Sequence, residues 1–179
     1  MTYDIIRSRR RTMAAQIKDG HLIVRAPLCA TDEEIHDFVQ KHQRWIEKHI
    51  YTAQSLNNIV PLTPDDLRNL VEQAKVVIPQ RVAHYAPLIG VTYGRITIRA
   101  QHSRWGSCSG KGNLNFNCLL MMTPPEVIDS VVVHELCHRK EMNHSPRFYA
   151  EVLRVYPDYQ KWHNWLKQNG LALMRRIVS

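Results

Sequence analysis

Apolar residues recur along the chain at two different spacings, which together predict a mixed α+β fold. Residues 11–18 and 21–26 are typical of two strands, because the Asp19-Gly20 dipeptide between them favours the tight turn of a hairpin. Two more strands are expected over residues 96–99 and 113–117. Most other apolar residues follow helical spacing.

The first helix is expected over residues 31–50. Thr31 and Glu34 have the spacing of a capping box. The apolar residues that follow lie at helical spacing: Ile35, Phe38, Val39, Ile46 and Ile50. Residues 51–62 are mostly polar and are predicted to be a linker. We therefore expect an N-terminal subdomain of hairpin and helix at residues 1–60 and a core at residues 61–179.

A second helix is predicted to begin at Thr63, with Pro64 in the first helical position. Its buried stripe would consist of Leu67, Leu70, Val71, Ala74 and Ile78. Pro79 is expected to kink or break the helix, because proline lacks the N–H that an interior position uses. The residues from Pro87 to Gly90 would end it.

The next helix is expected to begin in the segment Thr123-Pro124-Pro125-Glu126, which combines a capping box with a proline at the first helical position. Apolar residues surround much of its circumference, which is typical of a buried helix: Val127, Ile128, Val131, Val132 and Leu136. A further helix would begin at Ser145-Pro146, with Phe148, Val152 and Val155 facing inward. The last would cover residues 157–169 and end at Gly170.

The buried helix carries the motif His134-Glu135-Leu136-Cys137-His138. Residues four apart lie on one face of a helix, so His134 and His138 can reach one metal ion. Both continue the stripe of Val127 and Val131 and should point inward. Glu135 projects beside the pair and can take a proton from a zinc-bound water without being a ligand. The alternative is a pair of core histidines with polar partners.

A catalytic zinc needs a third protein ligand and one open position. His144 follows a short turn, Glu141-Met142-Asn143, and precedes the next helix, which would place it beside the site. The alternative is a surface or capping histidine. Glu151, in the following helix, is the rival ligand. The other histidines have no such spacing and are interpreted as structural or exposed.

The segment Arg104–Gly112 is rich in glycine and carries Lys111, which suggests a phosphate cradle, but its spacing does not fit a P-loop. A tight loop between strands, with Trp105 as a packing anchor and Cys108 as a buried thiol, is the simpler interpretation. A functional alternative is that the loop forms one wall of the active-site cleft.

Composition sets the broad class. The net charge of +8 is compatible with an anionic partner such as nucleic acid or nucleotide. No apolar run is long enough for a membrane helix, and the N-terminus has no apolar signal core, so a cytoplasmic location is expected. None of the four cysteines forms a CxxC pair, and we expect them to be reduced and buried: Cys29, Cys108, Cys118 and Cys137. A monomer is assumed.

Three segments resemble the YgjP-like metallopeptidase family, which is related to the SprT-like zinc proteases. They are Arg104-Trp105-Gly106-Ser107-Cys108-Ser109, the HExxH motif, and His144-Ser145-Pro146-Arg147-Phe148. N-terminal segments follow the family's order too, so the resemblance covers nearly the whole chain: Arg9-Arg10-Arg11-Thr12, Val24-Arg25-Ala26-Pro27 and Trp45-Ile46-Glu47-Lys48.

The resemblance implies a zincin-like core, in which the HExxH helix packs beside a small sheet, and it implies His144 as the third ligand. It leaves the substrate open. SprT relatives are tied to proteolysis of DNA-bound proteins, whereas some YgjP-like members carry a nucleotide pyrophosphatase label.

Three functions follow from these patterns. The first is a zinc metallopeptidase, with Glu135 as general base and zinc lowering the pKa of its bound water; manganese or nickel would also suit three histidines. The second is a metal-dependent pyrophosphatase acting on nucleoside triphosphates such as UTP. The third is a basic nucleic-acid-binding module with a structural zinc, which Glu135 argues against. Arg147 and Tyr149 are candidates for a second oxyanion donor.

Overall fold

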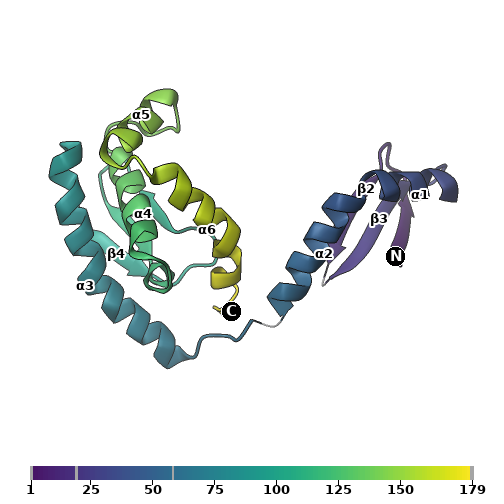
Figure 1. Cartoon of the computed structure of the whole chain (residues 1–179), viewed down its shortest axis with the longest axis horizontal. Coiled ribbons are helices and arrows are strands. Elements are labelled where there is room, and N and C mark those ends of the chain that lie inside the picture. Colours follow the sequence, from purple (N-terminus) through teal and green to yellow (C-terminus); the bar gives the residue numbers. More distant parts are fainter. Residues whose placement is uncertain (1, 19, 58, 178–179) are drawn as a thin grey trace. The chain divides into compact units, whose positions relative to one another are not determined.

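The structure is a computed structural model that describes residues 2–18, 20–57 and 59–177, with the backbone alone over 51–57. The chain divides into two compact units, Met1–Ile59 and Val60–Ser179. Figure 1 shows the helices and strands of each unit. Within the described residues, no helix is both long and apolar enough to cross a membrane.

The N-terminal unit contains a three-stranded sheet of order β1-β3-β2. Its strands are β1 (Asp4–Ser8), β2 (Ala14–Lys18) and β3 (His21–Pro27). The antiparallel pair β2 and β3 is the predicted hairpin, although Asp19 of its turn lies outside the described residues. The parallel strand β1 was not predicted, because every one of its residues is exposed and no apolar alternation marks it.

Two helices, α1 (Asp32–Lys41) and α2 (Gln43–Asn57), cover this sheet where one helix over residues 31–50 was expected. The capping box of Thr31 and Glu34 is present. The break is at His42, whose imidazole Nδ1 lies 2.8 Å from the carbonyl oxygen of Phe38. The buried residues of the unit come from β3, both helices and the loop before α1: Leu22, Val24, Ala26, Ala30, Ile35, Val39 and Ile46.

The predicted linker over residues 51–62 is wrong in its first part, because α2 continues to Asn57. The sequence of this part contains neither proline nor glycine, so a polar helix can continue through it until the chain approaches Pro61. Residue 58 of the predicted linker lies outside the described residues.

The C-terminal unit begins with the long helix α3 (Pro64–Ile89), capped by Thr63 and Asp66. Pro79 lies inside this helix and does not end it, so the predicted break is absent. Proline removes one backbone hydrogen bond, but buried residues on both sides of it hold the helix against the core: Ala74, Ile78, Val82, Tyr85, Ala86 and Ile89. Gly90 then ends the helix in the left-handed conformation, with φ of 78°.

A second three-stranded sheet follows, with order β4-β6-β5. Its strands are β4 (Ile96–Arg99), β5 (Gly106–Cys108) and β6 (Leu114–Asn117). The two predicted strands correspond to β4 and β6, whereas β5 lies inside the segment that was interpreted as a loop. The 3₁₀ helix η1 (Cys118–Met122) leads from β6 toward the next helix.

The helix α4 (Pro125–Cys137) contacts α3, α5, α6 and β5. Figure 1 shows it between α3 and α6. The predicted capping box is absent: Thr123 donates its hydroxyl to the carbonyl oxygen of Leu120 at 2.8 Å, and the N-cap residue is Pro124. Pro125 does occupy the first helical position. The HExxH helix therefore packs beside a small sheet, which confirms the expected α+β fold.

The chain ends with α5 (Pro146–Val155), capped as predicted by Ser145, and α6 (Tyr159–Met174). Gly170 was expected to end the last helix, but α6 continues through it to Met174. Gly170 is instead a packing position, because a Cβ atom there would lie 3.0 Å from Cζ2 of Trp105. Trp105 thus packs against the core as the sequence suggested.

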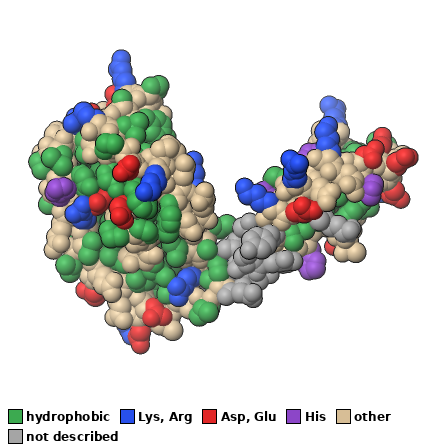
Figure 2. Space-filling model, viewed as in Figure 1, with side chains coloured by type: hydrophobic (Ala, Val, Ile, Leu, Met, Phe, Trp, Pro, Cys, Tyr) green, Lys and Arg blue, Asp and Glu red, His purple; other side chains and the backbone are tan. Residues whose placement is uncertain are grey.

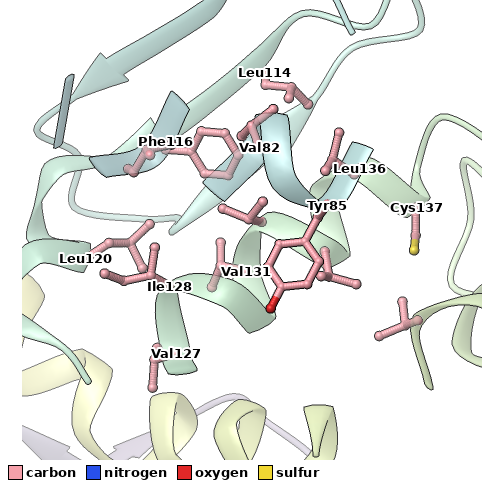
Figure 3. Packing of buried hydrophobic residues seen from close by; sticks show 14 of the residues in the cluster. Val82, Tyr85, Leu114, Phe116, Leu120, Val127, Ile128, Val131, Leu136 and Cys137 are labelled. Carbon is pink, nitrogen blue, oxygen red and sulfur yellow. The ribbon is translucent and has the colours of Figure 1, made fainter. Parts of the chain in front are cut away.

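The core of this unit joins α3, the second sheet, η1 and all three later helices. Figure 3 shows Val82, Phe116 and Val131 among the side chains that meet around α4. A bidentate ion pair also joins two helices: Arg81 of α3 donates to both carboxylate oxygens of Asp129 of α4, at 2.5 and 2.6 Å. Because α4 packs against other elements on several sides, apolar residues surround much of its circumference.

The four cysteines have free thiols. Cys118 and Cys137 are buried as expected, Cys108 is half-buried, and Cys29 is exposed, so the prediction of burial is wrong for Cys29. Cys29 lies in the N-terminal unit, directly before the buried Ala30.

Candidate metal centre

The last turn of α4 presents His134 and Glu135, and His138 caps its C-terminus in helical conformation, with φ of −61° and ψ of −14°. The helix therefore keeps its geometry through the whole motif, and the two imidazole rings lie edge to face with centroids 4.9 Å apart. This arrangement follows from the local spacing of the sequence alone.

His144 returns to the same place after a tight turn. The turn is held by backbone hydrogen bonds from Arg139, Lys140 and Glu141 to the last carbonyl oxygens of α4. The His144 ring centroid lies 4.9 Å from that of His134 and 4.8 Å from that of His138. Side-chain nitrogens of all three histidines lie within 4.8 Å of one another, and those of His134 and His144 are only 3.0 Å apart at Nε2.

The outer ring nitrogens of the helical pair are already bonded to the protein. His138 Nδ1 lies 3.0 Å from the carbonyl oxygen of Glu141, and His134 Nδ1 lies 2.8 Å from the hydroxyl of Tyr159. A carbonyl oxygen only accepts, so His138 carries its proton on Nδ1 and keeps the Nε2 lone pair free. Histidine ligands of metals are usually oriented in this way, by a hydrogen bond on the second nitrogen.

Burial keeps both helical imidazoles neutral, which a metal ligand requires. Loss of hydration lowers the pKa of His134 to about 3, with smaller contributions from His138 and His144. Burial also lowers the pKa of His138, and the hydrogen bond to the Glu141 carbonyl opposes this. Three converging imidazoles form a donor set that suits zinc.

Glu135 is buried, with 6% of its surface exposed. Burial raises the pKa of its carboxyl group to about 8, and the positive charge of Arg104 opposes that rise. The carboxyl group lies against the backbone of Gly106 in β5, where an added Cβ would be 2.6 Å from Oε1. Glu135 is not part of the histidine group, as the predicted role of a base rather than a ligand requires.

Glu151, the rival ligand, is bound elsewhere. Its carboxylate accepts from Arg154 at 2.5 Å and from Lys140 at 2.6 Å. These two cations, Arg154 foremost, lower its pKa to about 2. Among the described residues, the group of metal-binding side chains that the structure assembles consists of His134, His138 and His144, without Glu151.

The two suggested oxyanion donors occupy different surroundings. The Tyr149 ring is stacked near His144, with centroids 6.2 Å apart, so Tyr149 lies at the edge of the site. Arg147 is exposed on α5.

Two residues of α6, Tyr159 and His163, lie at the site although the sequence did not predict them there. Tyr159 bonds His134, and its hydroxyl lies 3.3 Å from Nδ1 of His163, which was interpreted as structural or exposed. His163 is half-buried beside the site, and burial lowers its pKa. The only signal in the sequence was the aromatic character of this helix, which is equally typical of a packed core.

The segment Arg104–Gly112 is both a wall of the site and, in its glycine-rich part, a tight turn. Trp105 and Gly106 line a cavity together with His134 and Glu135, so the segment does form one wall of the site. Its glycine-rich part is a tight turn rather than a phosphate cradle: the Gly112 N–H donates to Ser109 at 2.8 Å, and the Arg139 guanidinium packs against Gly112 and donates to Gly110.

The model of the YgjP-like, metallopeptidase domain family matches residues 11–68 and 66–169, so the chain belongs to the YgjP-like family. Two solved structures are similar to part of the chain, and both are described as metallopeptidase zymogens. Abylysin of Pyrococcus abyssi is 21% identical with a TM-score of 0.49, over 57% of this chain and 100% of its own.

Jannalysin of Methanocaldococcus jannaschii is 19% identical with a TM-score of 0.46, over 51% of this chain and 95% of its own. The comparison with curated proteins found no match. Membership of the family makes the chain a metallopeptidase-type domain and implies a catalytic metal, most commonly zinc in this class.

Proposed function

We propose that this protein is a zinc-dependent peptidase in which His134, His138 and His144 hold the metal and Glu135 is the general base. One observation carries the proposal: three imidazoles converge within 4.8 Å of one another, directly beside a buried glutamate that is not among them. A structural zinc is usually closed by four protein ligands and needs no base, so this donor set favours catalysis. Membership of a metallopeptidase family supports it.

Zinc bound here would lower the pKa of a water molecule and polarise the carbonyl group of the scissile bond. The positive charge of a bound metal would favour the ionised form of Glu135 against the effect of burial. In that form Glu135 accepts a proton from the attacking water and delivers it to the leaving amine as the C–N bond breaks. The products are a carboxylate and an amine, so one water molecule is consumed. Tyr159 and the Glu141 carbonyl orient the imidazoles, and Gly106 leaves room for the carboxyl group of Glu135.

The test uses the zinc-loaded full chain, an unfolded protein substrate and the Glu135→Gln variant. Glutamine keeps the shape of the side chain but cannot accept the proton, so we expect an activity loss of at least about 100-fold with unchanged zinc content. A chelator should abolish wild-type cleavage, and added zinc should restore it. Full activity of the zinc-loaded variant would refute the role of Glu135.

Cleavage of UTP serves as the second arm of the same assay. Among the described residues, the glycine-rich turn does not favour the pyrophosphatase alternative, because the Arg139 guanidinium packs against Gly112 and donates to Gly110. Figure 2 shows lysine and arginine side chains scattered over the visible face of the C-terminal unit, whereas a surface that binds nucleic acid has them clustered. Cleavage of UTP without cleavage of the unfolded protein would make the pyrophosphatase the function of this site.

A further inference from the structure

A cavity of about 160 Å³ lies beside Glu135 and His134, between α4, α6 and the start of β5. Its apolar walls are Trp105, Val131 and Leu166. Val131 and Leu166 are largely buried, with 7% and 8% of their surfaces exposed, and Trp105 is half-buried. We call this space the Trp105 cavity.

Apart from the carboxyl group of Glu135, which faces the metal centre, the hydroxyl groups in its lining already have partners inside the protein. Ser130 donates its hydroxyl to the carbonyl oxygen of Val127 at 2.8 Å. The Tyr159 hydroxyl is shared between His134 at 2.8 Å and His163 at 3.3 Å. An anionic occupant would thus lose its hydration beside the carboxyl group of Glu135 without gaining a counter-charge, which is costly. A cationic occupant would compete with the metal centre for that same carboxyl group, whereas an apolar occupant gains from contact with Trp105, Val131 and Leu166.

The wall formed by Trp105 is fixed in place from two sides. Its carbonyl oxygen accepts from the Asn117 N–H at 2.9 Å, and its indole ring lies where a side chain at Gly170 would collide with it. The next residue, Gly106, contacts the carboxyl group of Glu135. Glu135 itself lines the cavity together with His134, so an occupant lies directly beside the proposed general base.

We propose that the Trp105 cavity receives the apolar side chain of a substrate residue next to the scissile peptide bond, a side chain of about the size of leucine or phenylalanine. The proposal rests on the proposed peptidase function and adds a substrate preference to it. The size follows from comparison: an apolar cavity of about 150 Å³ holds a benzene-sized group. Alanine would leave most of the space empty, and tryptophan would exceed it.

Binding is tested without cleavage. The zinc-loaded Glu135→Gln protein is titrated with acetyl-leucinamide, acetyl-alaninamide and uridine, while NMR follows the methyl signals of Val131 and Leu166. We expect acetyl-leucinamide to shift these signals at concentrations about 10- to 100-fold lower than acetyl-alaninamide, as the difference in buried apolar area requires. Equal responses to the two amides, or a response to uridine alone, would overturn the proposal.

Cleavage specificity is tested on a mixture of peptides, with the cut sites read by mass spectrometry. Wild type should enrich leucine, phenylalanine and similar residues at one fixed position beside the cut. Val131→Phe fills the cavity and should remove this preference, whereas Leu166→Ala enlarges it and should admit tryptophan. The matched control is Leu171→Ala, which removes an exposed leucine of the same helix and should leave the profile unchanged.

The two proposals fail separately. Peptide cleavage with no preference at any position would overturn the cavity proposal and leave the peptidase standing. Selective binding of acetyl-leucinamide by a zinc-loaded protein that cleaves no peptide would support the cavity as an apolar subsite and overturn the peptidase. If Val131→Phe fails to fold, Leu166→Ala still tests the cavity proposal. An unchanged preference beside the cut site in Leu166→Ala would contradict the proposal that the Trp105 cavity receives the substrate side chain.

Discussion

Gly106 and Glu135 are packed so closely that no side chain fits between them. A Cβ atom on Gly106 would lie 2.6 Å from Oε1 of Glu135 and 2.7 Å from its Cγ, closer than real Cβ contacts allow. Gly106 has no positive φ angle, so the need for glycine here is one of space and not of backbone conformation. This contact joins the edge strand β5 to the general base of the proposed mechanism.

Gly106→Ala should therefore lower kcat. The added methyl group forces the carboxyl group of Glu135 to move, and a displacement of about 1 Å from reactive geometry costs about 100-fold in rate. Zinc content should stay that of wild type, because the three histidines are untouched. The matched control is Gly110→Ala, where an added Cβ meets nothing within 4 Å. Equal kcat values for the two zinc-loaded variants would contradict a positioning role for Gly106.

His144→Ala should lose zinc during dialysis, whereas Glu151→Gln should retain it. His144 lies with its Nε2 atom 3.0 Å from that of His134, while Glu151 is engaged by Lys140 and Arg154. Removal of one of three protein ligands should weaken zinc binding by more than the 10- to 100-fold typical of an outer partner. Metal analysis after dialysis measures this, and the opposite pattern would make Glu151 the third ligand.

Tyr159→Phe should weaken zinc binding by about 10- to 100-fold, because it removes the hydroxyl group that orients His134 at 2.8 Å. The aromatic ring stays, so the packing of α6 is kept. Tyr156→Phe is the matched control, since that hydroxyl donates to the carbonyl oxygen of Glu126, outside the histidine group. Competition with a chelator measures both affinities. Equal losses in the two variants would show that Tyr159 does not act through His134.

Local spacing accounts for the part of the site that the sequence could predict. His134, Glu135 and His138 share one helix, so periodicity alone places them together. His144 lies beyond a turn whose path depends on carbonyl oxygens of α4, so spacing only suggested it as a ligand and the family resemblance strengthened that prediction. Gly106, Tyr159 and His163 come from other elements, and their approach depends on tertiary packing that no spacing encodes.

The fold, too, could be predicted from the sequence only where a local pattern marks the helix or strand. Helices with strong caps were predicted at their observed starts, as at Thr63 and Ser145. Strand β1 carries no buried residue and β5 has only three residues, so neither leaves a pattern of alternation. Pro79 and Gly170 are helix breakers by their intrinsic preferences, but packing on the core overrides those preferences in α3 and α6.

Glu151 should stabilise the fold at neutral pH and lose that effect in acid. Arg154 and Lys140 lower its pKa from 4.5 to about 2 in the folded protein. A lowered folded-state pKa contributes stability above the unfolded-state value of 4.5, and this contribution disappears as the pH falls toward 2. With allowance for screening by solvent, its size at pH 7 is about 1–2 kcal/mol.

The measurement is the free energy of unfolding in urea for wild type and Glu151→Gln between pH 7 and pH 3. Glutamine does not titrate, so the difference between the two proteins isolates this carboxylate and should shrink steadily below about pH 4.5. Glu72→Gln is the matched control, because Glu72 also pairs with a cation three residues away, at 2.8 Å, but its side chain is 70% exposed. We expect that variant to differ from wild type by less than about 0.5 kcal/mol at every pH. A Glu151→Gln difference that stays constant down to pH 3 would show that the ion pairs do not hold this carboxylate in its charged form.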